Sequence, residues 1–254
     1  MLDAMYIAAV GLQAQQEQLN ATANNFANLN TTAYKRQSID FSSILDRTTV
    51  TAGATIVSSP DAKPASLMRF DLSPGAVHST GRALDIAISG TGFIPVELPN
   101  DKTGYSRGGS LQMNADGGLS LPSGQALKAD IRIPNGATNV QILPDGTVTA
   151  FVSGETTART LGQIELATFV NSDLLTYGGD GIFTPPDGTA EPTLAPPGED
   201  GTAQLTPQSL EGSNVDMTNE MVSMTLMQRV YELNSRVAQV ADEMMSMANN
   251  MRRD

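Results

Sequence analysis

Cysteine and tryptophan are missing from this sequence, histidine occurs once, and aromatic residues make up only 5% of it. Without cysteine the chain can form no disulfide, no thiolate metal site and no cysteine nucleophile. Basic residues are also scarce: 15 Lys and Arg stand against 27 Asp and Glu, and the formal net charge is −12. Because nucleic-acid phosphates are neutralised by basic side chains, so acidic a chain is not expected to bind nucleic acid.

Targeting and membrane-spanning segments of the usual kinds are absent as well. The first basic residue is Lys35, so the positively charged start of a signal peptide is missing. No apolar run approaches the roughly 18 residues that a membrane-spanning helix needs. We therefore expect a chain that is not embedded in a membrane and that is cytosolic by default, unless its export uses a route that needs no cleaved signal peptide.

Both ends of the chain are nearly free of proline and glycine, and apolar residues recur there in steps of three and four. The patterns cover residues 1–30 and 216–252 and predict helices of roughly 40 and 55 Å with narrow, coiled-coil-like seams. Asparagines near the first helix end favour its termination, and Ser213 with Asp216 has the spacing of a capping box. The N-terminal seam comprises Leu2, Met5, Ala9, Leu12, Gln16, Leu19, Ala23 and Phe26. The C-terminal seam comprises Leu226, Val230, Leu233, Val237, Val240, Met244, Met247 and Met251.

The middle of the chain has the opposite character. It holds nearly all of the 23 Gly and all 14 Pro, and short alternating runs at 83–88 and 162–169 predict strands. Turn signals separate them, at Asp116-Gly117, Asn135-Gly136, Asp145-Gly146 and Asp187-Gly188.

These patterns predict an α+β chain, in which a central all-β domain lies between long terminal helices that pair as a coiled coil. The expected parts are an N-terminal helix with its exit segment (1–46), an extended connector (47–75), a β-rich domain (76–209) with a Pro/Gly loop at 184–208, and a C-terminal helix (210–254).

A narrow seam must be buried against another helix, either in the same chain or in a neighbouring copy. Eight of the 12 methionines lie between Met217 and Met251, and flexible methionine suits contacts that adapt to different neighbours. Head-to-tail contacts that do not close would build a helical filament or tube. Periodicity alone leaves an intramolecular helical hairpin equally open.

Signals for chemistry are weak throughout. His78 stands beside Ser79 without the Gly-x-Ser-x-Gly pattern of a nucleophile elbow, and Gly90-Thr91-Gly92 lacks the third glycine of a dinucleotide loop. No carboxylates stand in a recognisable metal or glycosidase arrangement. We therefore expect no catalytic, cofactor-binding or metal-binding residues.

Several motifs closely resemble the bacterial flagellar rod and hook proteins. They lie at residues 23–36 (ANNFANLNTTAYKR), 79–88 with 105–107, 210–222 and 228–235 (QRVYELNS), in the family's order and over nearly the whole chain. Ala33, Gly108 and Val230 depart from the usual family residues and concern local packing.

The resemblance implies a structural subunit of the flagellar basal-body rod that self-assembles into a helical tube and transmits torque from motor to hook. The terminal helices would form the inner coiled-coil layer and the β domain the outer one. Other rod and hook proteins, and surrounding bushing rings, would be partners. The subunit would reach the periplasm-spanning rod unfolded, through the type III export apparatus with its assembly chaperones.

Within the family, the middle and last-helix motifs are most similar to the distal rod, and the proximal rod is the alternative. Hook proteins generally carry additional outer domains for which this length leaves no room. From other classes, a secreted β-domain binding module or adhesin, or a secreted β-domain enzyme, remains open.

The resemblance and the seams together give the candidate assembly residues. In the N-terminal helix they are Leu2, Met5, Leu12, Leu19, Asn24, Asn25, Phe26 and Asn28. In the C-terminal helix they are Leu226, Val230, Tyr231, Leu233, Asn234, Val237, Val240, Met244 and Met247.

Deleting residues 1–30 or 216–254 should abolish polymerisation and leave the β domain folded, because the assembly seams lie in the helices. Sedimentation would measure polymer, and circular dichroism the folded β domain. A truncated chain that still polymerised normally would contradict the expectation.

Overall fold

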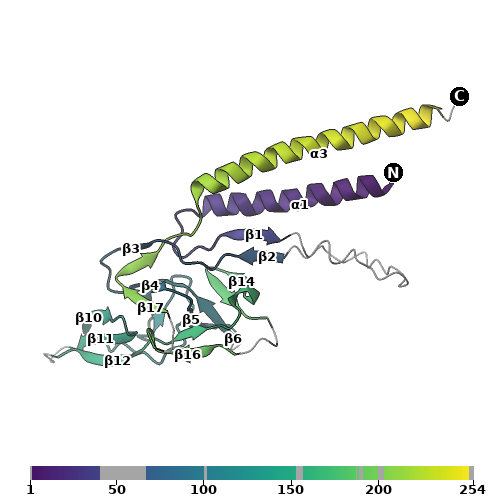
Figure 1. The fold of residues 1–254 in the computed structure, drawn as a ribbon. Coiled ribbons are helices and arrows are strands. Elements are labelled where there is room, and N and C mark those ends of the chain that lie inside the picture. Colours follow the sequence, from purple (N-terminus) through teal and green to yellow (C-terminus); the bar gives the residue numbers. More distant parts are fainter. Residues whose placement is uncertain are drawn as a thin grey trace. The chain divides into compact units, whose positions relative to one another are not determined.

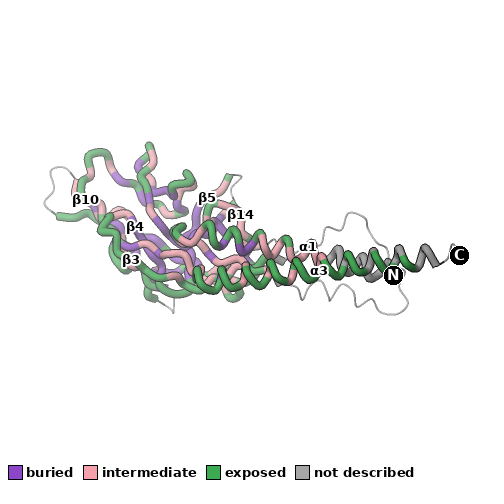
Figure 2. Tube along the Cα trace, turned by 90° about the horizontal axis from the view of Figure 1, so that it is seen from above, coloured by how far each residue is buried: buried purple, intermediate pink, exposed green. Residues whose placement is uncertain are grey.

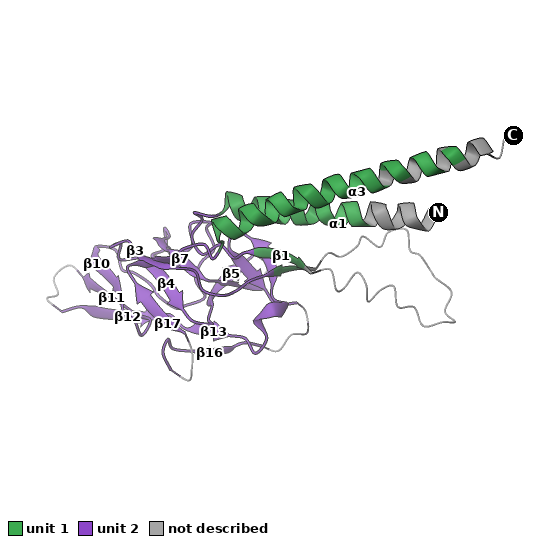
Figure 3. Cartoon of the chain, turned by 45° about the horizontal axis from the view of Figure 1, so that its top comes forward, with its two compact units in different colours: residues 1–28, 37–69, 215–254 green, residues 29–36, 70–214 purple. Residues whose placement is uncertain are grey.

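The computed structural model describes residues 2–40, 67–99, 102–152, 157–186, 188, 191–199 and 203–251. Within them the chain forms two compact units (Figure 3). Unit 1 comprises residues 1–28, 37–69 and 215–254, and unit 2 comprises 29–36 and 70–214. Most of the expected connector lies outside the described residues. Residues 29–36, expected to go with the N-terminal helix, belong instead to the β-rich unit 2.

Unit 1 contains the two terminal helices, α1 (Leu2–Ala27) and α3 (Met217–Met251). They lie side by side and run in opposite directions, so that both chain ends are found at the same end of the pair (Figure 1). The short strands β1 (Gln37–Asp40) and β2 (Leu67–Phe70) pair with each other, and β1 packs along α1. Both long helices were predicted within a few residues of their observed bounds.

Side chains define the helix ends next to unit 2. At the end of α1, the side chain of Asn28 donates a hydrogen bond to the carbonyl of Asn24 (2.9 Å), which satisfies one of the last helical carbonyls. At the start of α3, Oδ1 of Asp216 accepts from the backbone N–H of Thr218 (2.8 Å) and Asn219 (3.1 Å). The N-cap is therefore Asp216, and the predicted capping box led by Ser213 is wrong.

Unit 2 is built from short strands joined by turns, as the Gly/Pro-rich composition predicted. One antiparallel sheet has the order β14-β15-β6-β5 and a second β17-β4-β7. Their strands are β4 (Asp85–Ser89), β5 (Ile94–Leu98), β6 (Lys102–Ser106), β7 (Gly108–Ser110), β14 (Thr176–Gly179), β15 (Ile182–Thr184) and β17 (Gln204–Pro207).

The described part of unit 2 also contains a three-stranded sheet, β10-β11-β12, and three two-stranded sheets, β13-β16, β18-β3 and β8-β9. Their strands are β3 (Val77–Ser79), β8 (Gln112–Met113), β9 (Leu119–Ser120), β10 (Ala137–Ile142), β11 (Thr147–Val152), β12 (Arg159–Gln163), β13 (Leu166–Thr168), β16 (Thr193–Ala195) and β18 (Ser209–Glu211). A single 3-10 turn, η1, covers Ser172–Leu174. Helices and strands together make the chain α+β.

The predicted strand at 83–88 is β4, the middle strand of its sheet, and its residues from Asp85 to Ile88 are all buried. The predicted strand at 162–169 is divided between β12 and β13. The expected loop at 184–208 contains β16 and β17, and Leu205 of β17 is buried opposite Ile88. The density of Pro and Gly hid these strands, although Pro207 is tolerated at the end of an edge strand.

Two clusters of side chains fill unit 2, and the buried stretches of its chain are purple in Figure 2. The larger one is aliphatic and includes Ile86, Ile88, Val96, Leu166 and Leu205. The smaller cluster contains six of the chain's twelve aromatic residues. Their rings make edge-to-face and tilted contacts, with ring centroids 4.8–5.9 Å apart. The aromatic members are Phe70, Phe93, Tyr105, Phe169, Tyr177 and Phe183.

Glycine occupies turns where a side chain would not fit. Gly117 and Gly146 have φ of +79° and +82°, and a Cβ on either would lie 2.4 Å from a backbone carbonyl oxygen. The Asp-Gly turns expected there are confirmed. Gly136 has φ of +84° at a third expected turn, whereas Asp187 lies outside the described residues.

Ala33 adopts the left-handed conformation, with φ of +55°. A Cβ in this region costs roughly 1–2 kcal/mol, which exceeds the extra chain entropy that glycine loses on folding. Ala33→Gly should therefore raise the free energy of unfolding by roughly 0.5–1 kcal/mol. Urea unfolding followed by tyrosine fluorescence would measure it, because the chain has no tryptophan.

Ala76→Gly is the matched control. Ala76 has no left-handed φ, so the same change there should lower the free energy of unfolding by roughly 0.5–1 kcal/mol. Equal changes in the free energy of unfolding for the two variants would show that the backbone of Ala33 is not strained.

Candidate assembly interface

Three segments of unit 2 that are far apart in sequence meet in what we call the junction: residues 33–36, 71–76 and 211–214. Backbone hydrogen bonds join them pairwise, from Ala33 to Glu211 (2.8 Å), from Asp71 to Arg36 (2.9 Å) and from Gly212 to Ala76 (2.7 Å). By sequence, the first segment follows α1 and the last one precedes α3. The junction therefore joins three segments that adjoin, in sequence, places where the chain enters or leaves unit 2.

A buried carboxylate lies at the centre of the junction. Oε1 of Glu211 accepts from Nζ of Lys35 and from the backbone N–H of Gly75 (2.9 Å), and Oε2 accepts from Nη2 of Arg107 (3.3 Å). All three charged side chains are almost fully buried. A buried charge is tolerated only when it is paired and hydrogen-bonded, and here one anion serves two cations.

Carbonyl oxygens supply the remaining partners of the two cations. Lys35 Nζ donates to the carbonyl of Ser73 (2.8 Å). Arg107 Nη1 donates to the carbonyls of Gly90 (2.8 Å) and Gly92 (2.7 Å), and its guanidinium lies 5.5 Å from the ring centre of Phe93. The arginine thus ties the loop between β4 and β5 to the junction.

Burial dominates the electrostatics of both cations. Desolvation lowers the pKa of Lys35 below its ordinary value, and the attraction of Glu211 opposes that shift. Desolvation also lowers the pKa of Arg107, again against the attraction of Glu211. At the edge of the junction, hydrogen bonds from Ser73 lower the pKa of Asp71. The Glu211 carboxylate is therefore the group that compensates the cost of burying two cations.

Asn214 adds an uncharged bridge between the same segments. Its Oδ1 accepts from the backbone N–H of Arg36 (2.7 Å), and its Nδ2 donates to the carbonyls of Asp71 (2.7 Å) and Ser73 (3.1 Å). Its own backbone N–H donates to the carbonyl of Tyr34 (3.3 Å). The residue lies in the segment expected to cap the last helix, and its long-range role could not be read from local spacing.

Unit 1 has a polar centre of its own at Asn25. The side chain exchanges hydrogen bonds with the backbone of Gln37, donating to its carbonyl (2.9 Å) and accepting from its N–H (2.8 Å). The same Nδ2 lies 3.3 Å from Oε2 of Glu220 at the start of α3, and both side chains are buried. Nearby, the Thr22 hydroxyl donates to the sulfur of Met227 (3.8 Å). Asn25, a candidate assembly residue, thus links α1, β1 and α3 within one chain.

The buried face of the last turns of α1 differs from the predicted seam. Ala21, Thr22 and Asn25 are buried, whereas Ala23 and Phe26 of the seam are exposed. The seam was drawn through apolar residues, while the observed face is selected by the hydrogen bonds of Asn25. Leu12, Leu19 and Asn28 are half-buried, Asn24 is exposed, and the side chains of Leu2 and Met5 lie outside the described residues.

On α3 the predicted seam is exposed along most of its length (Figure 2). We call these residues the α3 stripe; their three- and four-residue spacing places them on one face. Val230 and Asn234 are half-buried and Tyr231 is half exposed. Contiguous exposed apolar surface marks a site of interaction. The α3 stripe comprises Leu226, Leu233, Val237, Val240, Met244 and Met247, each 50–62% exposed.

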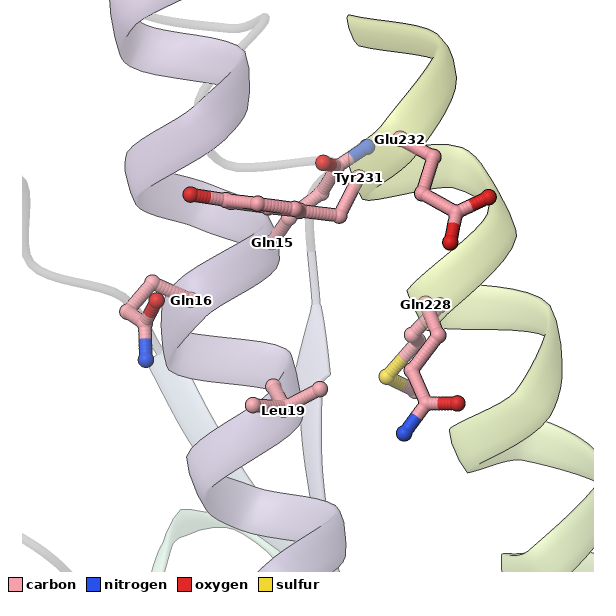
Figure 4. A pocket seen from close by; sticks show the side chains of 7 residues that line it. Gln15, Gln16, Leu19, Gln228, Tyr231 and Glu232 are labelled. Atoms are coloured by element: carbon pink, nitrogen blue, oxygen red, sulfur yellow. The ribbon is translucent and has the colours of Figure 1, made fainter. Parts of the chain in front are cut away.

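A hollow of about 330 Å³ lies between α1 and α3 (Figure 4). Leu19 and Met227 contribute apolar lining, and the side chain of Tyr231 extends from α3 toward α1 (Figure 4). Gln15, Gln16, Gln228 and Glu232 complete its lining. It resembles in size and lining a socket for a side chain from another helix.

Nothing in the described ranges has the arrangement of a catalytic or metal site. His78 is exposed on β3, where it pairs with Leu210 of β18. Among these residues no three His, Asp or Glu side chains are grouped to hold a metal ion. Neither α1 nor α3, nor any other described helix, is long and apolar enough to cross a membrane.

Models of three protein families match the chain in sequence order. Residues 5–35 match the flagella basal body rod protein family, 87–150 the flagellar hook protein FlgE/F/G D1 domain, and 206–251 the flagellar basal body rod FlgEFG protein C-terminal family.

Relatives match over the full length. The flagellar basal-body rod protein FlgG of Caulobacter vibrioides is 34% identical, over 99% of this chain and 100% of the relative. FlgG of Agrobacterium fabrum is 35% identical, over 97% and 98%. The flagellar basal-body rod protein FlgF of Escherichia coli is 29% identical, over 98% and 97%. This chain belongs to the flagellar basal-body rod protein family. It is accordingly a structural subunit of the flagellar rod and not an enzyme.

The three family matches also contain the three charges of the junction. Lys35 is in the N-terminal match, Arg107 in the central one and Glu211 in the C-terminal one. Sequence reasoning quoted the motifs around all three as family signatures. It missed that the charges meet, because Lys35 and Arg107 are 176 and 104 positions away from Glu211 in the chain.

Replacing Glu211 with Gln should lower the free energy of unfolding by about 3–5 kcal/mol, because both buried cations would lose their counter-charge. Urea unfolding followed by tyrosine fluorescence would measure the change. Glu165→Gln is the matched control: this carboxylate is exposed in unit 2, and its loss should change stability by about 0.5 kcal/mol or less. A Glu211→Gln variant as stable as the control would show that the junction is not held by its charges.

Proposed function

We propose that this chain is a subunit of the distal rod, and that copies of it self-assemble through α1 and α3 into a helical tube. In that tube the helices form the inner, coiled-coil layer and the β unit the outer layer. The polymer acts as a drive shaft that transmits torque from motor to hook.

The observation that carries this proposal is the α3 stripe. Burying the exposed half of one Leu, Val or Met side chain contributes roughly 1 kcal/mol. The stripe has six such side chains on one face, and each stays 50–62% exposed although α1 packs against α3. A second copy supplies the helix that this seam needs.

The hollow between the helices gives the contact its register. In knobs-into-holes packing, a side chain of one helix enters a hole formed by residues of its neighbour. The socket has Leu19, Met227 and Tyr231 in its lining, so it favours an apolar knob from the neighbouring subunit. Candidate residues Leu19 and Tyr231 act there, as lining of the socket.

A drive shaft also needs stiff building blocks. The junction joins the first segment of unit 2 to its last segment by hydrogen bonds and ion pairs. These contacts resist separation of the two segments when torque acts on the β unit. The stiffness of the rod rises as subunits are added, because every new interface restrains neighbours that are already bound.

Partners and export follow from the same proposal. Beyond copies of itself, the chain contacts other rod and hook proteins at the ends of its segment and the bushing rings around it. It is delivered unfolded by the type III export apparatus with assembly chaperones, without cleavage of a signal peptide.

Leu233→Asp tests the stripe directly. A carboxylate buried in an apolar seam costs several kcal/mol, so sedimentable polymer should be lost at any practical concentration. In cells carrying only this variant, electron microscopy should show truncated rods without hooks, with a stub as long as the proximal rod. Leu194→Asp is the control, because Leu194 is 50% exposed in unit 2 and Leu233 59% exposed.

Two outcomes would overturn the proposal. One is a Leu233→Asp variant that polymerises like the wild-type chain. The other is intact, motile flagella after deletion of the gene in a strain without a paralogue. If the truncated rods in these cells were shorter than the proximal rod, the chain would instead be a subunit of the proximal rod.

A further inference from the structure

Two methionines lie in the C-terminal half of the α3 stripe, among aliphatic side chains. Met244 and Met247 are three residues apart and 55% and 58% exposed. Their stripe neighbours Val237 and Val240 carry no hydrogen-bond donor in their side chains. In the single chain the two thioethers are therefore accessible to small solutes. In the proposed polymer the same surface is buried against apolar side chains of a neighbouring subunit.

We propose that Met244 and Met247 are a reversible oxidation site that controls whether a free subunit can polymerise. The inference rests on the proposed function, since it concerns the same helix face. The reactant is a hydroperoxide, with hydrogen peroxide as the simplest member.

The chemistry is a two-electron oxygen transfer. The thioether sulfur attacks one peroxide oxygen, the O–O bond breaks, and an S–O bond forms. The proton on the transferred oxygen passes to the leaving oxygen, so that the sulfur is oxidised to a sulfoxide and the peroxide is reduced to water or to an alcohol. Methionine sulfoxide reductases reverse the change, so the site can be restored.

The consequence for assembly follows from polarity. The sulfoxide oxygen is a strong hydrogen-bond acceptor, and the stripe offers it no donor once a neighbouring helix excludes water. Burying an acceptor without a partner is costly, and sulfoxides disrupt methionine-rich interfaces for this reason. In an oxidised subunit unit 2 remains folded, but the α3 stripe no longer packs against a neighbouring helix. In the polymer the same sulfur atoms are covered and protected.

Other methionines of the chain provide internal comparisons. Met113 is 58% exposed on β8 of unit 2, the same exposure as Met247. Met227 is half-buried in the α1–α3 contact, where its sulfur accepts a hydrogen bond from the Thr22 hydroxyl. We therefore expect peroxide to oxidise Met244, Met247 and Met113 of the free chain at similar rates, and Met227 more slowly.

The test uses the purified full-length chain, treated with hydrogen peroxide and then assayed by sedimentation. Peptide mass spectrometry gives the oxidation of each methionine. Oxidation of Met244 and Met247 should raise the critical concentration for polymerisation about tenfold or more, and reductase treatment should restore it. In preformed polymer, the oxidation rate of Met244 and Met247 relative to Met113 should fall about tenfold.

Variants separate the site from general damage. The double variant Met244→Leu/Met247→Leu should polymerise without peroxide and keep polymerising after it. Met113→Leu should remain as sensitive to peroxide as the wild-type chain. Met247→Gln, which places a permanent polar group in the stripe, should polymerise poorly without any oxidant.

The inference is overturned if the double leucine variant loses polymerisation on peroxide treatment as fully as the wild-type chain does. It is also overturned if wild-type chains fully oxidised at Met244 and Met247 polymerise normally. Failure of the proposed function gives a different result, because untreated wild-type chains would then form no polymer through α3.

Discussion

The carboxylate of Glu211 is the group on which the rest of unit 2 depends. It binds Lys35 from the start of the unit's sequence and Arg107 from its middle, and Glu211 itself lies near the end of that sequence. Neither cation could be buried without it, and each cation in turn fixes backbone carbonyls of its surroundings. The chain is thereby closed at the point where it passes to and from its helices.

The two units solve the problem of stability in different ways. Unit 2 contains an aliphatic core, an aromatic cluster and a junction whose three charges pair with one another. Unit 1 has a satisfied polar centre at Asn25 and Glu220 but leaves an apolar stripe uncovered. A subunit that must polymerise benefits from this division, because its folding can be complete while its assembly surface still needs a neighbour.

Sequence reasoning was reliable where structure is local and periodic. The two long helices, the β character of the middle and the Asp-Gly turns follow from the spacing of apolar residues and from the backbone needs of glycine. It failed where a contact overrides local preference. Strands β16 and β17 form inside a Pro- and Gly-rich stretch because pairing partners, Leu166 and Ile88 among them, are presented by distant strands. The buried face of α1 is set by Asn25, a polar residue that no apolar pattern includes.

By itself, the sequence determined the α+β class, the positions of both helices, the apolar seam of α3 and membership of the rod family, because periodicity and short motifs are written in neighbouring residues. Only the tertiary structure decided that most of the seam of α3 stays exposed in the single chain, that Asn25 meets Glu220, and that Lys35, Arg107 and Glu211 share one buried site. Hydrogen bonds and ion pairs act over a few ångströms in space. Which residues come that close is settled by the packing of the whole chain, and no local pattern contains it.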